Sequence, residues 1–185
     1  MELYFYYASK DYIDFLKNAE RAEHSSTRVP DVDYTHKQKF LYGAVLTIDG
    51  MNYYVPVSSY SKPQQDLILI KDKAGAVKGS LRFSYMIPIP QECLQKLDIN
   101  QFESADYRVK VSKELAFVRR NRDKIFKKAK STYNAVISKR KYDPNYCDFK
   151  LLESAFIAYC REHDLTVPAA YLEKHPELFS FQGEA

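Results

Sequence analysis

Short apolar or alternating stretches fill the first half of the chain and predict strands. Five such stretches are Leu3–Tyr7, Phe40–Ile48, Asn52–Val57, Leu67–Ile70 and Ser80–Tyr85. Asp49-Gly50 separates the second from the third, and this dipeptide favours the type I′ turn of a two-residue hairpin. The run 86–90 contains two prolines, so we expect it to extend or edge the sheet.

Helical spacing appears near the beginning of the chain and again in its second half. Tyr12, Phe15, Leu16 and Ala19 share one helical face, and Ser9 suits the N-cap of that helix. The polar stretch 24–38 then predicts a loop. A short helix is expected over 91–97, one long helix or two over about 106–138, and another helix over 149–160.

The order of these elements predicts the fold class. Hairpins in the first half and helices at the start and in the C-terminal half predict an α+β domain, not a doubly wound sheet. The 185 residues suit one domain, which we place at 1–163, with a C-terminal tail or appendage at 164–185. A Gly-rich phosphate loop and a G-x-S-x-G motif are both missing from the sequence.

Charge is concentrated in one segment. Between Asp106 and Lys141 there are 13 Lys and Arg and three acidic residues, which gives a net charge of +10. Because the whole chain carries a net charge of +4, the remainder carries a net charge of −6. Such a segment predicts a long basic helix that binds a polyanion. The alternative is an ordinary solvated helix face.

Cysteine and histidine usage argues against a metal site. The three cysteines have no C-x-x-C spacing and the four histidines have no metal-ligand spacing, so we expect no disulfide, metal or cofactor and a reducing cytoplasm. The N-terminus does not resemble a signal peptide, and the sequence contains no apolar run of about 18 residues, so no membrane span is expected.

Candidate chemistry lies at the open end of the predicted hairpin. Ser58, Ser59 and Lys62 follow its second strand, and Lys39 opens the first, so the hairpin makes Lys39 and Ser58 neighbours. A polar turn with solvated charges is the alternative interpretation. Tyr12 can supply a phenol to this region, although a Tyr in an apolar helical stripe is also typical of a core.

Five motifs, in order, resemble the ToxN and AbiQ toxin family. They are Tyr4 with Ser9–Lys17, Lys39–Leu46 with Gly50 and Tyr53–Ser59, Phe83–Ile89, Lys113–Ile125 and Cys147–Glu153. The resemblance spans about residues 1–162. It implies a compact, strongly bent antiparallel β-sheet with flanking helices, similar to MazF- and Kid-type RNase toxins.

The resemblance also implies an active site. Carried over residue by residue, its members are Tyr12, Tyr34, Lys39, Ser58, Ser59 and Lys62. The family commonly has Thr-Ser-Pro-Lys where this chain has one residue more before the lysine. Either Lys62 reaches back into the site or Ser61 takes its place.

The family's activity implies what this site does. The resemblance implies a metal-independent, sequence-selective endoribonuclease that leaves 2′,3′-cyclic phosphate and 5′-hydroxyl ends. Repeated pseudoknots of an RNA antitoxin, which the toxin also processes, would inhibit it in a closed toxin–RNA ring, and the system would act in phage abortive infection. The lysines would supply charge to the phosphate, and one with a lowered pKa could transfer a proton.

The basic helix would then grip RNA through phosphates. Its candidate RNA-binding residues are Arg108, Lys110, Lys113, Arg119, Arg120, Arg122, Lys124, Lys127, Lys128 and Lys130. Two alternatives remain: a non-catalytic nucleic-acid-binding module, which needs no Ser58, Ser59 or Lys62, and a MazF-type toxin inhibited by a protein.

Overall fold

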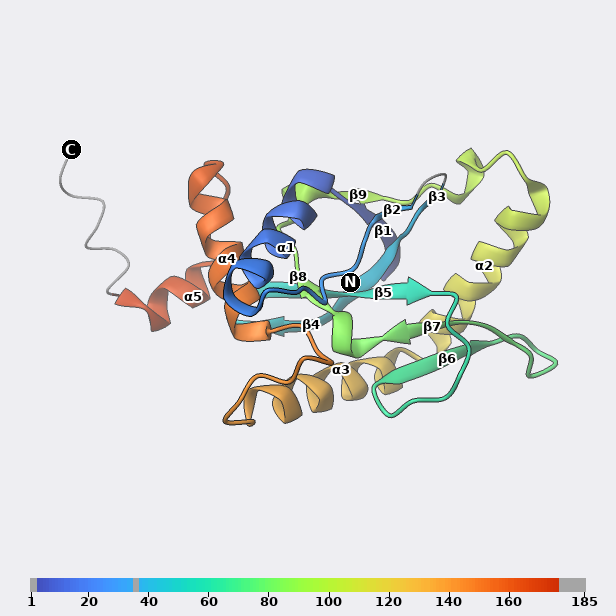
Figure 1. Ribbon diagram of the computed structural model, residues 1–185. Helices are drawn as coiled ribbons and strands as arrows, with labels where there is room; N and C mark the ends of the chain where they lie inside the picture. Colours follow the sequence, from blue (N-terminus) through green and yellow to red (C-terminus); the bar gives the residue numbers. More distant parts are fainter. Residues whose placement is uncertain (1–2, 35–36, 177–185) are drawn as a thin grey trace.

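The computed structural model describes residues 3–34 and 37–176 and is built around one antiparallel sheet (Figure 1). Its strand order is β6-β7-β5-β4-β1-β9, with β8 pairing alongside β5. The strands are β1 (Tyr4–Ala8), β4 (Leu41–Ile48), β5 (Met51–Ser58), β6 (Leu67–Lys71), β7 (Val77–Arg82), β8 (Ile87–Pro88) and β9 (Leu94–Lys96). The predicted α+β class and antiparallel sheet are confirmed, and the likeness to MazF- and Kid-type toxins stays a prediction.

Helices flank the sheet on several sides. They are α1 (Lys10–His24), α2 (Ala105–Arg120), α3 (Arg122–Ile137), α4 (Phe149–Glu162) and α5 (Ala169–Lys174). Helices α1 and α4 pack against each other, α3 lies against β4 below the sheet in Figure 1, and α2 lies beside β6. The 3₁₀ helices are η1 (Phe83–Tyr85), η2 (Gln91–Cys93) and η3 (Ile99–Gln101).

The β4–β5 hairpin forms as predicted. Asp49 and Gly50 both have positive φ, 49° and 83°, as a type I′ turn requires. The turn is also a docking point for the C-terminal segment, because a Cβ on Gly50 would lie 2.6 Å from the Cβ of Pro168. Lys174 on α5 forms an ion pair with Asp49. The boundary between 1–163 and 164–185 stays a prediction, and the described part of the appendage packs on this hairpin.

The hairpin is irregular in its middle. The register between β4 and β5 shifts between Gly43 and Leu46, which locally bends the strand. A Cβ on Gly43 would lie 2.3 Å from the ring of Tyr54, so the two strands approach closely only because residue 43 is glycine.

Two short strands, β7 and β8, pair with the same edge of β5. Val57 and Ser58 pair with Leu81 and Ser80 of β7, whereas Tyr53 and Tyr54 pair with Pro88 and Ile87 of β8. The helix η1 interrupts this edge, so the prediction of a strand through Tyr85 was wrong after Arg82. The chain therefore leaves the sheet between Arg82 and Ile87, opposite the part of β5 that lies between Tyr54 and Val57.

Other predictions need correction. The helix expected over 91–97 is η2 followed by β9, which pairs with β1 and continues through Leu97 N–H donating to the Phe5 carbonyl. The predicted loop contains a small hairpin of β2 (Asp33–Tyr34) and β3 (Lys37–Gln38).

The basic segment forms two helices, not one long one. Asn121 separates α2 from α3, and its side-chain amide donates a 2.8 Å hydrogen bond to the Phe117 carbonyl. This bond ends α2 locally, because an asparagine side chain competes with the backbone for hydrogen bonds.

A buried carboxylate joins three elements of the core. Glu153 of α4 accepts hydrogen bonds from Tyr53 of β5 (2.9 Å) and Tyr133 of α3 (2.6 Å), and Lys150 donates to it at 2.8 Å. Burial, together with the bond to Glu153, raises the pKa of Tyr133 to about 12, and burial raises the pKa of Tyr53 well above its usual value. Both phenols therefore remain neutral donors.

Candidate active site and basic groove

The open end of the β4–β5 hairpin brings together two of the predicted site residues. Lys39 precedes β4 and Ser58 ends β5, and both line a hollow of about 220 Å³. Backbone bonds hold this end in place, with Lys39 N–H donating to Val32 (3.0 Å) and Val57 N–H donating to Phe40 (3.2 Å). The other lining residues are Thr27, Arg28, Val29, Pro30, Asp31, Pro56, Val57, Arg82 and Tyr85.

The loop after β5 forms a tight serine turn. The hydroxyl of Ser58 accepts a 3.1 Å hydrogen bond from the N–H of Tyr60, so its oxygen is held at the mouth of the hollow. Ser59 and Lys62 are exposed beyond it and do not line the hollow. The structure thus places Lys39 with Ser58 and leaves Ser59 and Lys62 on the adjoining loop. Ser61 is exposed in the same way.

A buried glutamate shapes the opposite wall of the hollow. Glu20 of α1 is fully buried, and one of its oxygens accepts bonds from the Thr27 hydroxyl (2.8 Å), the Arg28 N–H (2.7 Å) and the Val29 N–H (3.3 Å). Its other oxygen accepts a 2.8 Å bond from the N–H of Asp148, the N-cap of α4. This carboxylate therefore fixes the loop that forms the wall. Sequence reasoning did not find it, because three of the bonds come from an irregular loop and the fourth comes from Asp148, which is distant in the sequence.

Sequence reasoning also missed the arginines of the hollow. Arg82 ends β7, and its guanidinium lies over the rings of Tyr85 (4.1 Å) and Tyr60 (5.2 Å). Arg28 donates from Nε to the Pro144 carbonyl. A usable signal existed for Arg82 alone, because it is a charged residue between the apolar residues Leu81 and Phe83.

Tyr12 lies in the core and not at the hollow. Its side chain is fully buried, its hydroxyl donates a 2.6 Å bond to the Pro88 carbonyl, and its ring packs edge-on against Tyr159 of α4. Burial raises its pKa well above the usual value, so the phenol stays protonated. The core interpretation of this residue fits the structure better than the catalytic role that the resemblance implied. The Tyr34 side chain lies outside the described part of the structure.

The position of Tyr12 gives a direct test. Tyr12→Phe is expected to cleave RNA at a rate close to that of the parent, while losing about 1 kcal/mol of unfolding free energy with the Pro88 hydrogen bond. Cleavage of a short RNA and urea unfolding of the same preparation measure both quantities. Severe loss of cleavage at unchanged stability would return Tyr12 to the catalytic set.

The ten predicted RNA-binding residues do not form one strip, because α2 and α3 are separate helices. Several of them have intramolecular partners. Arg108 bonds to the carbonyl of Phe102, Arg119 donates to that of Leu3 (3.2 Å), Arg120 donates to that of Ala116 (3.3 Å), Lys128 donates to that of Gln65 (2.9 Å), and Arg122 lies over Phe126 (5.0 Å). Lys113, Lys124, Lys127 and Lys130 are exposed.

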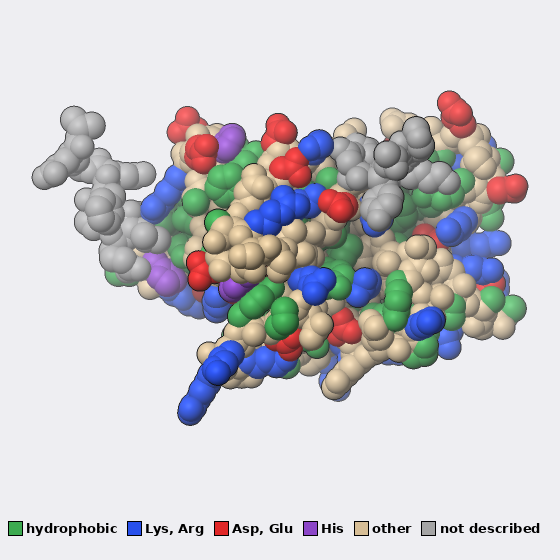
Figure 2. Space-filling view, in the orientation of Figure 1, with side chains coloured by type: hydrophobic (Ala, Val, Ile, Leu, Met, Phe, Trp, Pro, Cys, Tyr) green, Lys and Arg blue, Asp and Glu red, His purple; other side chains and the backbone are tan. Residues whose placement is uncertain are grey.

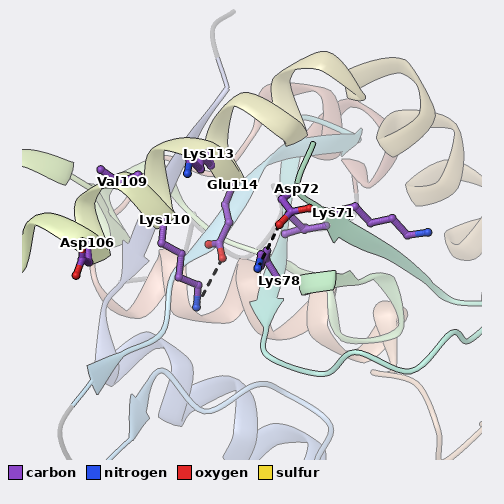
Figure 3. Close-up of a pocket in the computed structure, with 9 residues that line it drawn as sticks. Lys71, Asp72, Lys78, Asp106, Val109, Lys110, Lys113 and Glu114 are labelled. Carbon is purple, nitrogen blue, oxygen red and sulfur yellow. Dashed lines mark ion pairs between the residues drawn. The ribbon is translucent and has the colours of Figure 1, made fainter. Parts of the chain in front are cut away.

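A second hollow lies between α2 and the β6–β7 hairpin (Figure 3). It measures about 360 Å³. Lys110 and Glu114 extend toward it from α2 in Figure 3, and Lys113 of α2 and Lys71 and Lys78 of the hairpin also line it. Glu114 is buried in its wall, 3.8 Å from Lys110, and Lys78 pairs with Asp72 at 3.2 Å. Burial raises the pKa of Glu114. Figure 2 shows Lys and Arg side chains gathered over this end of the molecule.

Two negative findings apply to residues 3–34 and 37–176. Within these ranges, the structure places no three His, Cys, Asp or Glu side chains close enough together to hold a metal ion. Across the same ranges, none of the helices combines the length and the apolar character that a membrane crossing requires.

Comparisons with known proteins place the chain among named relatives. The endoribonuclease ToxN of Pectobacterium atrosepticum is 29% identical over 171 residues, covering 88% of this chain and 96% of that protein. The endoribonuclease AbiQ of Lactococcus lactis subsp. lactis is 25% identical over 177 residues, covering 88% and 92%.

Solved structures agree with these relatives. One, reported for selective toxin inhibition by a non-coding RNA pseudoknot in a type III system, has a TM-score of 0.74 and 25% identity, covering 86% of this chain and 98% of its own. The structure of AbiQ, at 24% identity and a TM-score of 0.72 over 87% and 99%, shares the fold. The family described as toxin ToxN of type III toxin–antitoxin systems matches residues 4–157. This chain belongs to the family of ToxN toxins.

Proposed function

We propose that the chain is an endoribonuclease toxin of a type III toxin–antitoxin system that cleaves RNA without a metal ion. The observation that carries the proposal is the hollow at the hairpin's open end, where Lys39 and Ser58 lie with two arginines. The curated relatives are named endoribonucleases, which supports the same activity. Cytoplasmic action in phage abortive infection follows from this proposal.

Cleavage transfers the phosphorus from the 5′-oxygen of one nucleotide to the 2′-oxygen of the preceding ribose. The ribose 2′-oxygen loses its proton and bonds to phosphorus, and the bond from phosphorus to the 5′-oxygen breaks as that oxygen gains a proton. The products carry a 2′,3′-cyclic phosphate and a 5′-hydroxyl. The phosphorus centre gains negative charge in the transition state, so fixed cations and hydroxyl donors beside it lower the barrier.

We assign each residue a role in this reaction from its position at the hollow or on the adjoining loop. Lys39 stands beside the phosphate and supplies charge or a proton, and Ser58 holds a phosphate oxygen or the 2′-hydroxyl. Ser59 and Lys62 act from the adjoining loop, and Tyr34 positions the ribose or stacks on a base. Holding the reacting atoms in line supplies a further part of the rate enhancement.

RNA binding uses the basic surfaces. The second hollow, the basic groove between α2 and the β6–β7 hairpin, offers positive charge to RNA phosphates, and so do the exposed lysines of α3. We assign to these surfaces an RNA antitoxin built of repeated pseudoknots, which assembles with the toxin into a closed ring. The relative inhibited by a non-coding RNA pseudoknot supports this assignment.

Salt dependence tests the RNA-binding groove. The double variant Lys71→Glu with Lys113→Glu is expected to bind RNA more weakly than the parent. The slope of the logarithm of its binding constant against the logarithm of salt concentration is expected to be flatter by roughly one to two, because each lost phosphate contact removes about 0.7–0.9 from that slope. Fluorescence anisotropy across a salt series measures both. Arg140→Glu with Lys141→Glu, two exposed residues between α3 and α4, is the matched control with the same change in charge. A parent affinity indifferent to salt would contradict phosphate-driven binding.

Mapping of cleaved ends tests the activity itself. Purified protein, freed of nucleic acid and kept in EDTA, is incubated with mixed cellular RNA, and the new 5′ ends are sequenced. Site-selective cuts with 5′-hydroxyl ends, lost in the double variant Ser58→Ala with Ser59→Ala, are expected. Tight RNA binding without cuts would instead make the chain a nucleic-acid-binding module.

A further inference from the structure

The guanidinium of Arg82 occupies an unusual environment at the edge of the hollow. The side chain is only half-buried, yet its Nε is fully covered and has no hydrogen-bond partner among the described residues. The same guanidinium lies over the rings of Tyr85 and Tyr60. Among residues 3–34 and 37–176, it pairs with no carboxylate.

This environment costs the folded protein stability. A buried N–H that loses water without gaining an acceptor is destabilising, and a charged group makes the cost larger. Ring contacts offset part of it, because an arginine face is attracted to a tyrosine ring. An apolar side chain of the same length would fill this position without the buried donor, so packing alone does not explain an arginine here.

The fold directs this arginine toward the hollow. Arg82 is the last residue of β7, directly before η1 interrupts the paired edge of β5. Ser58 pairs with Ser80 two positions earlier on the same strand, and both Ser58 and Arg82 line the hollow. Tyr60, whose N–H bonds to the Ser58 hydroxyl, also contacts the guanidinium. The serine turn and the arginine are therefore held as one unit.

We infer that Arg82 binds the non-bridging oxygens of the scissile phosphate and stabilises the charge that develops on them. The inference rests on the proposed ribonuclease function and adds a residue to it. A guanidinium stays charged at any working pH and offers paired donors in a plane that matches a phosphate. The two tyrosines hold this plane in position before substrate arrives, so little reorganisation is needed during the reaction.

Arg28 provides a matched comparison within the same hollow. It also carries a guanidinium, but its Nε already donates to the Pro144 carbonyl, and its side chain is exposed. Arg28→Met removes the same charge from the same hollow as Arg82→Met. General loss of positive charge would affect both variants alike, whereas a specific phosphate contact would single out Arg82.

The experiment measures cleavage of one defined RNA under saturating conditions by the parent and both methionine variants. Arg82→Met is expected to lower kcat by about 10²–10³-fold, the usual effect of removing one donor to a developing oxyanion, with a smaller change for Arg28→Met. Its thermal midpoint is expected to equal or exceed that of the parent, because the buried unpaired donor is gone. Arg82→Lys is expected to recover only a small part of kcat.

Chemical rescue provides the decisive measurement. Added guanidinium at millimolar concentration is expected to raise kcat of Arg82→Ala and to leave Arg28→Ala and Ser58→Ala unchanged. Near-parental kcat of Arg82→Met would overturn the inference, and so would a loss of kcat that tracks a lowered thermal midpoint without rescue. In either case RNA cleavage by the parent protein would still support the ribonuclease function. A parent protein that does not cleave RNA would contradict the ribonuclease function itself.

Discussion

Lys39→Ala is expected to reduce kcat for RNA cleavage by about 10³-fold, the largest loss we expect from a single substitution. Lys39 lines the hollow beside Ser58, so its ammonium is placed to oppose charge on the phosphate or to transfer a proton. Removing either contribution alone commonly costs 10²-fold or more, roughly 3 kcal/mol or above. Single-turnover cleavage of a fluorescent RNA measures the loss.

Two companion variants separate the possible roles of Lys39. Lys39→Arg keeps the positive charge but cannot exchange a proton near neutral pH, so retained activity would assign a charge role and lost activity a proton-transfer role. Lys62→Ala tests the exposed loop lysine, which does not line the hollow. If Lys39→Ala cleaves RNA as well as the parent, the hollow is not the active site.

Glu20→Gln is expected to lower the unfolding free energy by about 2–4 kcal/mol and to slow cleavage as well. The carboxylate accepts four hydrogen bonds, three from the loop 27–29 and one from the N-terminus of α4. An amide turns an NH₂ group toward some of these donors, which leaves buried N–H groups unpaired. Cleavage slows because the freed loop forms one wall of the hollow.

Tyrosine fluorescence or circular dichroism in a urea titration measures the stability change, since the chain contains no Trp. Glu23→Gln is the matched control, an exposed glutamate on the same helix. Hydrogen exchange at the Arg28 and Val29 amides should accelerate in Glu20→Gln alone. Equal stability of the two variants would show that the Glu20 hydrogen bonds do not hold the loop.

Local sequence signals predicted the elements they control. The Asp49-Gly50 turn sets the register of its own hairpin, so the neighbourhood of Lys39 and Ser58 could be predicted from the sequence. The strand β9 was missed because three residues show no alternation, and only the pairing with β1 makes them a strand. Two helices were one of the two possibilities for residues 106–138, but the position of the break at Asn121 could not be predicted, because neither Gly nor Pro marks it.

The remainder of the site depends on pairings between distant segments. Arg82 reaches the hollow because β7 pairs with β5, Ser58 with Ser80 and Val57 with Leu81, and no local pattern encodes a pairing over more than 20 positions. Tyr12 shows the opposite case. Its helical spacing indicated a core position as the alternative to the catalytic role that the resemblance implied, and the fold buries its side chain with the hydroxyl bonded to the Pro88 carbonyl.

The double contact of Glu20 has a consequence for synthesis of the protein on the ribosome. Asp148, whose N–H completes the bonds to this carboxylate, follows Arg28 by 120 positions. Translation at roughly 5–20 residues per second separates the two by many seconds. During that interval the nascent chain contains Lys39 and Ser58 but not the helix that secures the wall opposite them. The wall of the hollow is therefore completed only after the N-terminus of α4 has been synthesised.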